Sequence, residues 1–290
     1  MPRPGLPTEQ IPAEKIVWMN GYATPPQMRI KPVHAALSVG RLLANKEDTR
    51  QVFEIVKSLT GGAGKRFFVR FSETDYGRRV ITEPIKVEAL LGDRDALRAL
   101  PEGSVGRAYL DFMEGEDLTP EGILDAAAES GVDLRGDTQF PEFFRAFLHI
   151  EIVHDLWHVL TGYGRDTLGE LCLLAFTRAQ TGNHALSAIT GIGAIATTAE
   201  QPRQPIRQAI SEGAKRGQHA VWFPGLDIEA MLPKPLEAVR AELNLTAPVI
   251  YNSVPADIRA GLLKPKLRQT QTERESGKVE NDKSDMPHCC

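Results

Sequence analysis

The chain has 290 residues, of which 42% are hydrophobic and 25% charged, and its formal net charge is −4. Such a chain can bury a core without disulfides, and its charge excludes a broad basic surface for nucleic acid. Its three cysteines are Cys172, Cys289 and Cys290. An adjacent pair at the chain end cannot form a disulfide framework, so we expect a reducing, intracellular compartment.

The first 20 residues contain neither the apolar run of a signal peptide nor the Arg-rich, acid-poor composition of a transit peptide. The sequence contains no run of 18 or more strongly apolar residues, so no transmembrane helix is predicted. We therefore expect a cytoplasmic protein. Residues 1–32 are Pro-rich and predicted to be extended, and residues 264–290 are polar and predicted to be a disordered tail. The domain is expected over residues 33–263.

The first helical pattern begins near His34, and a second follows over residues 48–62, with Asp48 as its N-cap and two glycines at its end. We interpret GGAGK at 61–65 as a turn, because Leu59 occupies the position of the first glycine of a phosphate loop. FFVRF at 67–71 is predicted to be a short strand or an extended connector.

The remaining segments predict helices throughout. Residues 140–163 form the longest and most apolar one, which we expect to be central and buried. Residues 166–182 are predicted to return antiparallel to it. The other predicted helices cover residues 86–100, 104–118, 119–130, 203–222 and 235–245. The sequence therefore predicts a single all-α domain of about seven to eight helices with a central antiparallel helical hairpin.

Residues 181–199 carry no Asp, Glu, Lys or Arg, and are rich in Gly, Ala and Thr. They are predicted to form either a helix buried in the core or one that contacts lipid. A basic set close by in sequence could bind anionic headgroups or form a solvated helix face. This set consists of Arg203, Arg207, Lys215 and Arg216.

The most apolar predicted helix carries a polar cluster. His154 and His158 are four residues apart, so both imidazoles can reach one ion from the same helix face. Asp155 lies about 100° around the helix and could bind the ion or orient a histidine. Asp166 is expected to cap the next helix, which would let Glu170 point back toward the histidines. Two imidazoles with one or two carboxylates suit Zn²⁺ or Fe²⁺.

A single histidine on an apolar helix is more often a hydrogen-bonded core residue. Two histidines with a neighbouring Asp and a suitably placed Glu are harder to bury without an ion, because an uncompensated buried carboxylate costs several kcal/mol. His149 lies five residues before His154, off the ligand face. We interpret it as a structural or pocket residue.

HDLWH at 154–158 followed by eleven residues and Glu170 resembles the signature of the ubiquinone (coenzyme Q) biosynthesis protein 4 family. GRRVITEP at 77–84, ALPEGSVGRAYLDFM at 99–113 and DIEAMLPKPLEAVRAELNL at 227–245 extend the resemblance over roughly residues 30–250. Eukaryotic members have Arg-Tyr-Arg-Glu where this chain has His-Ile-Glu-Ile at 149–152. A function of those arginines in binding an anion is therefore not expected here. Without a transit peptide, the chain is expected to be a bacterial member.

The resemblance implies an all-α fold and a peripheral position on the inner membrane. It implies metal ligation by His154, Asp155, His158 and Glu170, with zinc as the expected divalent metal and Fe(II) as the alternative. The implied reaction replaces the C1 carboxyl of a polyprenyl-hydroxybenzoate by hydroxyl, as an oxidative lyase of the 4-hydroxy-3-methoxy-5-polyprenylbenzoate decarboxylase type. Other ubiquinone-biosynthesis proteins are the implied partners, and a homo-oligomer is left open.

Two alternatives compete with this enzyme. In the first, the protein is a scaffold or isoprenoid-lipid-binding component of the biosynthetic complex, and the ion only joins two helices. In the second, it is a zincin-like hydrolase with Asp155 as the base. Asp is one methylene shorter than the usual Glu, so its reach to a metal-bound water is poor.

Overall fold

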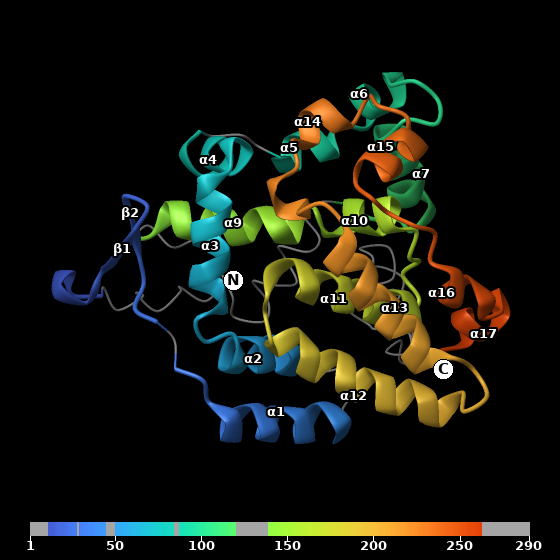
Figure 1. The fold of residues 1–290 in the computed structure, drawn as a ribbon, viewed down its shortest axis with the longest axis horizontal. Coiled ribbons are helices and arrows are strands. Elements are labelled where there is room, and N and C mark those ends of the chain that lie inside the picture. The colour runs from blue at the N-terminus through green and yellow to red at the C-terminus, as the bar shows by residue number, and fades with distance from the viewer. Residues whose placement is uncertain (1–10, 28, 45–49, 84–86, 120–138, 263–290) are drawn as a thin grey trace, which may run out of the picture.

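A computed structural model describes residues 11–27, 29–44, 50–83, 87–119 and 139–262 (Figure 1). Within these residues the chain forms sixteen α-helices, two 3-10 helices and one small sheet. The all-α prediction is thus confirmed in its main point. The predicted helix at 119–130 and the predicted tail at 264–290 fall outside the described residues, apart from Thr119.

The elements follow one another in this order along the chain. The first half contains η1 (Ala13–Lys15), β1 (Val17–Met19), β2 (Tyr22–Thr24), α1 (Pro32–Ala44), α2 (Arg50–Leu59), α3 (Ala63–Glu73), α4 (Asp75–Thr82), α5 (Val87–Gly92), α6 (Arg94–Ala99) and α7 (Val105–Gly115). The second half contains α9 (Pro141–Ile152), α10 (His154–Thr161), α11 (Thr167–Thr181), α12 (Ala185–Glu200), α13 (Ile206–His219), η2 (Phe223–Gly225), α14 (Ile228–Met231), α15 (Leu236–Glu242), α16 (Val249–Ser253) and α17 (Ala256–Gly261).

The N-terminal segment contains a β-hairpin that the Pro-rich composition did not predict. β1 and β2 pair antiparallel, with Val17 opposite Thr24. The turn is Asn20–Gly21, and both residues have positive φ, 49° and 83°. An Asn-Gly pair favours this two-residue hairpin turn, because both residues tolerate the left-handed conformation. The sequence therefore held a signal for the hairpin that composition alone conceals.

The prediction of a strand or connector at 67–71 is wrong, because these residues lie inside α3. Phe67, Phe68 and Phe71 are all buried, at the spacing of one helix face. Phe67 and Phe71 stack with ring centroids 5.6 Å apart. The aromatic run is too short, and too weakly marked by turn residues, to distinguish a strand from a helix by sequence alone. Tertiary packing determines that it is helical.

The predicted number of seven to eight helices is too low, because expected long helices are interrupted. Residues 86–100 divide into α5 and α6, since the Asp93 side chain accepts the Ala96 N–H and starts a new helix. Residues 140–163 divide into α9 and α10 at Val153, which has φ −84° and ψ 1°. The two helices follow one another across the middle of the molecule (Figure 1).

The core joins α10 to the helices around it through aromatic side chains. Trp157 of α10 is 1% exposed and packs edge-on against Phe176 of α11 and Phe223 of η2, at 6.4 and 5.4 Å between ring centroids. Phe176 and Phe223 also contact each other at 4.8 Å. This packing fixes the apolar face of α10. Because the helix is held in place, its polar side chains are also fixed in position.

The uncharged segment forms α12, which packs against α2, α11 and α13. The helix is confirmed, but it is half-buried, and Ile195 is 63% exposed. Its contact with lipid stays a prediction. Among the described residues, none of the helices combines the length and the apolar character needed to span a bilayer.

Candidate metal centre

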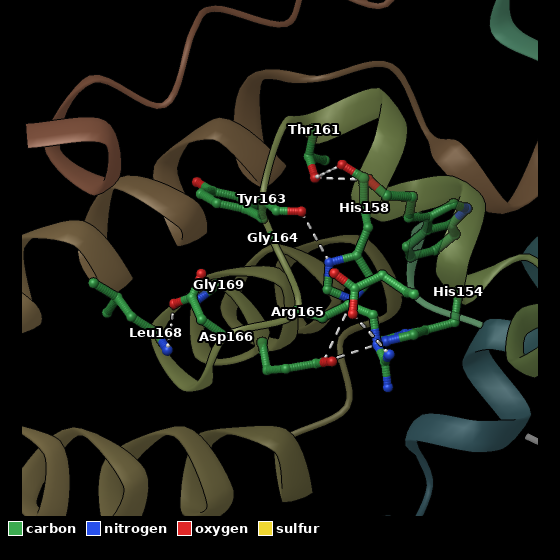
Figure 2. Close-up of polar contacts among 12 residues, drawn as sticks. His154, His158, Thr161, Tyr163, Gly164, Arg165, Asp166, Leu168 and Gly169 are labelled. Atoms are coloured by element: carbon green, nitrogen blue, oxygen red, sulfur yellow. Dashed lines mark hydrogen bonds and ion pairs between the residues drawn. The ribbon is translucent and has the colours of Figure 1, made fainter. Parts of the chain in front are cut away.

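Two histidines of α10 form one side of the site. His154 is the first residue of α10, and His158 follows one turn later, with ring centroids 5.0 Å apart (Figure 2). The His158 side chain is fully buried, whereas the His154 side chain is 20% exposed. The i,i+4 spacing places both rings on one helix face, as predicted. The site is therefore anchored in the core at His158 and reaches solvent at His154.

A short turn brings the third residue to this face. Gly162 ends α10 in the left-handed conformation, with φ 76°. Asp166 then caps α11, because its Oδ1 accepts the N–H groups of Leu168 and Gly169 at 3.1 Å each. Glu170 lies one turn into α11, and its Oε2 is 3.5 Å from Nε2 of His154 and 3.4 Å from Nε2 of His158. The predicted cap and the predicted reach of Glu170 are confirmed.

The ring of His158 is oriented by the same turn. Its Nδ1 lies 3.1 Å from the backbone oxygen of Tyr163. A carbonyl only accepts, so Nδ1 carries a proton and the ring is turned with Nε2 toward Glu170. That buried Nε2 has no hydrogen-bond partner within the described residues. Phe112 of α7 covers the ring, with centroids 5.6 Å apart and planes nearly parallel.

The carboxylate of Glu170 is held in its charged form. Burial by itself would raise its pKa, but charge attraction and hydrogen bonds from His158 and His154, both of which need a proton on Nε2, lower the pKa well below its usual range. An ionised carboxylate is the form in which Glu binds a metal, and a bound cation would replace the imidazole protons as its positive partner. The charge state therefore supports a cation site.

The donor set fits a small divalent ion. Among the described residues, His154, His158 and Glu170 place one ligand atom each within 4.8 Å of one another. Ligand atoms bound at 2.0–2.2 Å to a tetrahedral ion lie about 3.4 Å apart, close to the two separations between Glu170 and the histidines. Asp155 is 3% exposed and does not belong to this group. Its function as a ligand stays a prediction.

Two arginines that the sequence did not link to the site hold the end of α10. Arg240 of α15 donates to the backbone oxygens of Leu160 and Val159 at 3.0 and 2.8 Å. Arg216 of α13 donates to the oxygen of Thr161 at 2.8 Å. Cations at a helix C-terminus satisfy its free carbonyls and its dipole. The interpretation of Arg216 as part of a surface set is wrong, because it is 6% exposed and bound to backbone.

His149 lies apart from the metal group, as predicted. It is 2% exposed and packs between Phe71 and Tyr76, at 5.4 and 5.5 Å between ring centroids. Burial lowers the pKa of His149 to about 3, against a smaller opposite effect of the Pro224 carbonyl. His149 is therefore a neutral core residue over the ordinary pH range.

Comparison with known proteins places this geometry in a family. The family model described as coenzyme Q (ubiquinone) biosynthesis protein Coq4 matches residues 35–249. The chain is 29% identical over 175 residues to the mitochondrial ubiquinone biosynthesis protein COQ4 homolog of Bos taurus, and 28% identical over 178 residues to that of Homo sapiens. These matches cover 59% and 60% of this chain, and 62% and 63% of those relatives' own lengths.

A fungal relative and a solved structure extend the match. The mitochondrial ubiquinone biosynthesis protein COQ4 of Yarrowia lipolytica is 26% identical over 232 residues, which is 74% of this chain and 80% of that protein. A crystal structure from Nostoc punctiforme PCC 73102, provisionally named as a ubiquinone biosynthesis protein, superposes with a TM-score of 0.55 at 18% identity. It covers 74% of this chain and 98% of its own, which shows a shared fold. With a family match that spans both histidines and Glu170, the chain belongs to the Coq4 family of coenzyme Q (ubiquinone) biosynthesis proteins.

Proposed function

We propose that the protein is a metal-dependent enzyme of ubiquinone biosynthesis that acts at ring C1 of a polyprenyl-hydroxybenzoate. The observation that carries this proposal is the Glu170 carboxylate within 3.5 Å of both histidine Nε2 atoms, in a chain of this family. His154, His158 and Glu170 would hold the ion. Asp155 would serve as a further ligand or move a proton.

The charges of the site suit an aromatic acid. With His154, His158 and Glu170 as the only ligands, two neutral imidazoles and one carboxylate carry a single negative charge, so a bound dication would leave the site with a net positive charge. An ion held there would supply positive charge for the ring carboxylate and for the negative charge that develops as CO2 leaves. The side chains of His154 and Glu170, each 20% exposed, mark the side from which the ring would approach.

The proposed chemistry separates the two candidate metals. Replacement of the carboxyl by hydroxyl breaks the bond from C1 to the carboxyl carbon and forms a bond from C1 to oxygen. This is a two-electron oxidation of the ring, so it needs an oxidant such as dioxygen. Fe(II) suits that chemistry, whereas Zn²⁺ is limited to Lewis-acid catalysis of the decarboxylation.

The polyprenyl tail needs an apolar surface near the ion. Gly193 of α12 lies against Leu171, the residue after Glu170. We propose that the tail follows the uncharged surface of α12, where Ile195 is exposed, and that this surface rests on the inner membrane. Sedimentation of the protein with anionic liposomes, compared with an Ile195→Asp variant, tests the membrane contact. Equal sedimentation of both proteins would contradict it.

One feature supports the non-catalytic alternative. The three candidate ligands come from two consecutive helices, so an ion there would also join α10 to α11 as a structural site. In this reading the protein is a scaffold that binds isoprenoid lipid and other ubiquinone-biosynthesis proteins, alone or as a homo-oligomer.

A His154→Ala variant separates enzyme from scaffold. We expect protein purified without oxygen to contain about one metal ion per chain and, once dioxygen is admitted, to convert a short-tailed hydroxybenzoate. We expect the variant to lose both properties while its helical content remains. His184→Ala, at an exposed histidine, is the control. Loss of metal with an intact fold and unchanged quinone production would leave the scaffold as the function.

A further inference from the structure

The hydroxyl of Tyr251 closes the turn between the two helices of the candidate metal centre. It accepts the Gly164 N–H at 3.0 Å and donates to Asp166 Oδ2 at 2.5 Å. Tyr251 lies in α16, 85 residues beyond Asp166 along the chain. One hydroxyl from a helix distant in sequence thus links Gly164 and Asp166 within the turn.

This turn positions the candidate ligands of both helices. The Tyr163 backbone oxygen orients His158, and Asp166 caps the helix that carries Glu170. The turn is also packed at backbone distance, because a Cβ on Gly169 would lie 2.0 Å from the Gly164 oxygen. A shift of this turn would therefore change the position of Glu170 relative to the histidine.

Tyr251 is itself held firmly. It is 1% exposed, and its ring packs against Tyr163 at 5.3 Å and under the Arg259 guanidinium at 4.4 Å. The Glu212 carboxylate of α13 accepts the N–H groups of Ile250 and Tyr251 and fixes the start of α16. Burial and the Asp166 carboxylate raise the pKa of Tyr251, so the hydroxyl keeps its proton at ordinary pH.

We propose that Tyr251 is a positioning residue of the metal centre, which sets the geometry of Glu170 and His158 through Gly164 and Asp166. This inference rests on the proposed metal site. Groups that orient metal ligands at one remove usually change metal affinity by about 10- to 100-fold. The hydroxyl of Tyr251 acts one contact further out, through Gly164 and Asp166, so we expect its removal to reach only the lower end of that range.

Tyr251→Phe tests the inference, because it removes the hydroxyl and keeps the ring. We expect this variant to bind Zn²⁺ and Co²⁺ about 10-fold more weakly than the wild-type chain, measured in competition with a chelating dye. The visible absorption of the Co²⁺-loaded variant should also change, since that spectrum reports the ligand geometry. Tyr22→Phe is the matched control, because it removes a tyrosine hydroxyl from β2 and leaves the turn between α10 and α11 unchanged.

The outcomes separate the two proposals. If the wild-type chain binds neither ion, the proposed metal site fails and this inference falls with it. If the wild-type chain binds metal and Tyr251→Phe shows the same affinity and the same Co²⁺ spectrum, only the inference is overturned. If Tyr251→Phe does not fold, Asp166→Asn decides: it keeps an oxygen for the helix cap, and an unchanged affinity and spectrum would overturn the inference.

Discussion

Two buried histidine environments lie on consecutive helices and differ in almost every respect. His149 of α9 is enclosed by Phe71 and Tyr76, and burial lowers its pKa to about 3. His158 of α10 is equally buried, but its Nδ1 is bound to a carbonyl and its Nε2 faces the Glu170 carboxylate. In the comparison, burial among aromatic rings keeps His149 neutral and away from other charged groups. A polar partner on each side of the ring is what prepares a histidine to bind a metal.

The largest effect is expected from Glu170→Gln, which changes only the metal environment. The amide is a poorer ligand and carries no charge, so we expect metal affinity to fall by more than the roughly 100-fold seen when supporting groups are removed. Metal content after dialysis is the measurement. Glu73→Gln, at an exposed residue at the end of α3, should retain the metal. If the Glu170 variant retained the metal, Glu170 would not be what distinguishes the His158 environment from the His149 environment.

Gly169→Ala disturbs the His158 and Glu170 environment by displacing the backbone of the turn. The new Cβ would lie 2.0 Å from the Gly164 oxygen, and neither group can move without opening the turn. We expect the free energy of unfolding to fall by about 3 kcal/mol, as for an overpacked core, with weaker metal binding. Urea denaturation gives the value.

Gly191→Ala is the control for this substitution, since a Cβ there meets nothing within 4 Å. Alanine in the helix interior should be neutral or stabilise the protein by up to about 1 kcal/mol. Equal stability of the two variants would show that the turn is not tightly packed.

His149→Phe tests the other environment through pH. The folded chain keeps His149 neutral down to about pH 3, whereas in the unfolded chain it binds a proton below its ordinary pKa of 6.5. The unfolded state therefore binds more protons between these values, and stability falls as the pH decreases below 6.5. At pH 5 this contribution amounts to about 2 kcal/mol.

We expect the phenylalanine variant to lose about 2 kcal/mol less stability than the wild-type chain between pH 7 and pH 5. Urea denaturation at both pH values measures the difference, and contributions of other groups cancel. His219→Phe, at an exposed histidine, should follow the wild-type chain. An identical pH dependence for His149→Phe would mean that this ring titrates in the folded protein.

The smallest effect is expected from Arg240→Ala, at the end of α10. The variant loses hydrogen bonds to two helix carbonyls, but the arginine side chain is 28% exposed, so water replaces part of the interaction. We expect about 1 kcal/mol of lost stability from thermal or urea unfolding. Arg207→Ala, at an exposed arginine of α13, should change stability by less. An equal effect in both variants would show that the cap is unimportant.

The sequence by itself determined the local parts of the site. The i,i+4 spacing of His154 and His158, the Asp166 cap and the position of Glu170 one turn later all act within a few residues, where helix geometry is fixed by the backbone. The same holds for the helical class, which follows from apolar periodicity. The break at Val153 carries no Pro or Gly, so the sequence did not predict it.

Only the tertiary structure decided which distant groups support that site. Arg240 reaches α10 across 80 residues of sequence, and Tyr251 reaches Asp166 across 85. The tertiary structure also decided that His149 faces aromatic rings while His158 faces a carboxylate. No pattern within one helix encodes such contacts, because they depend on how the separate helices pack around a common core.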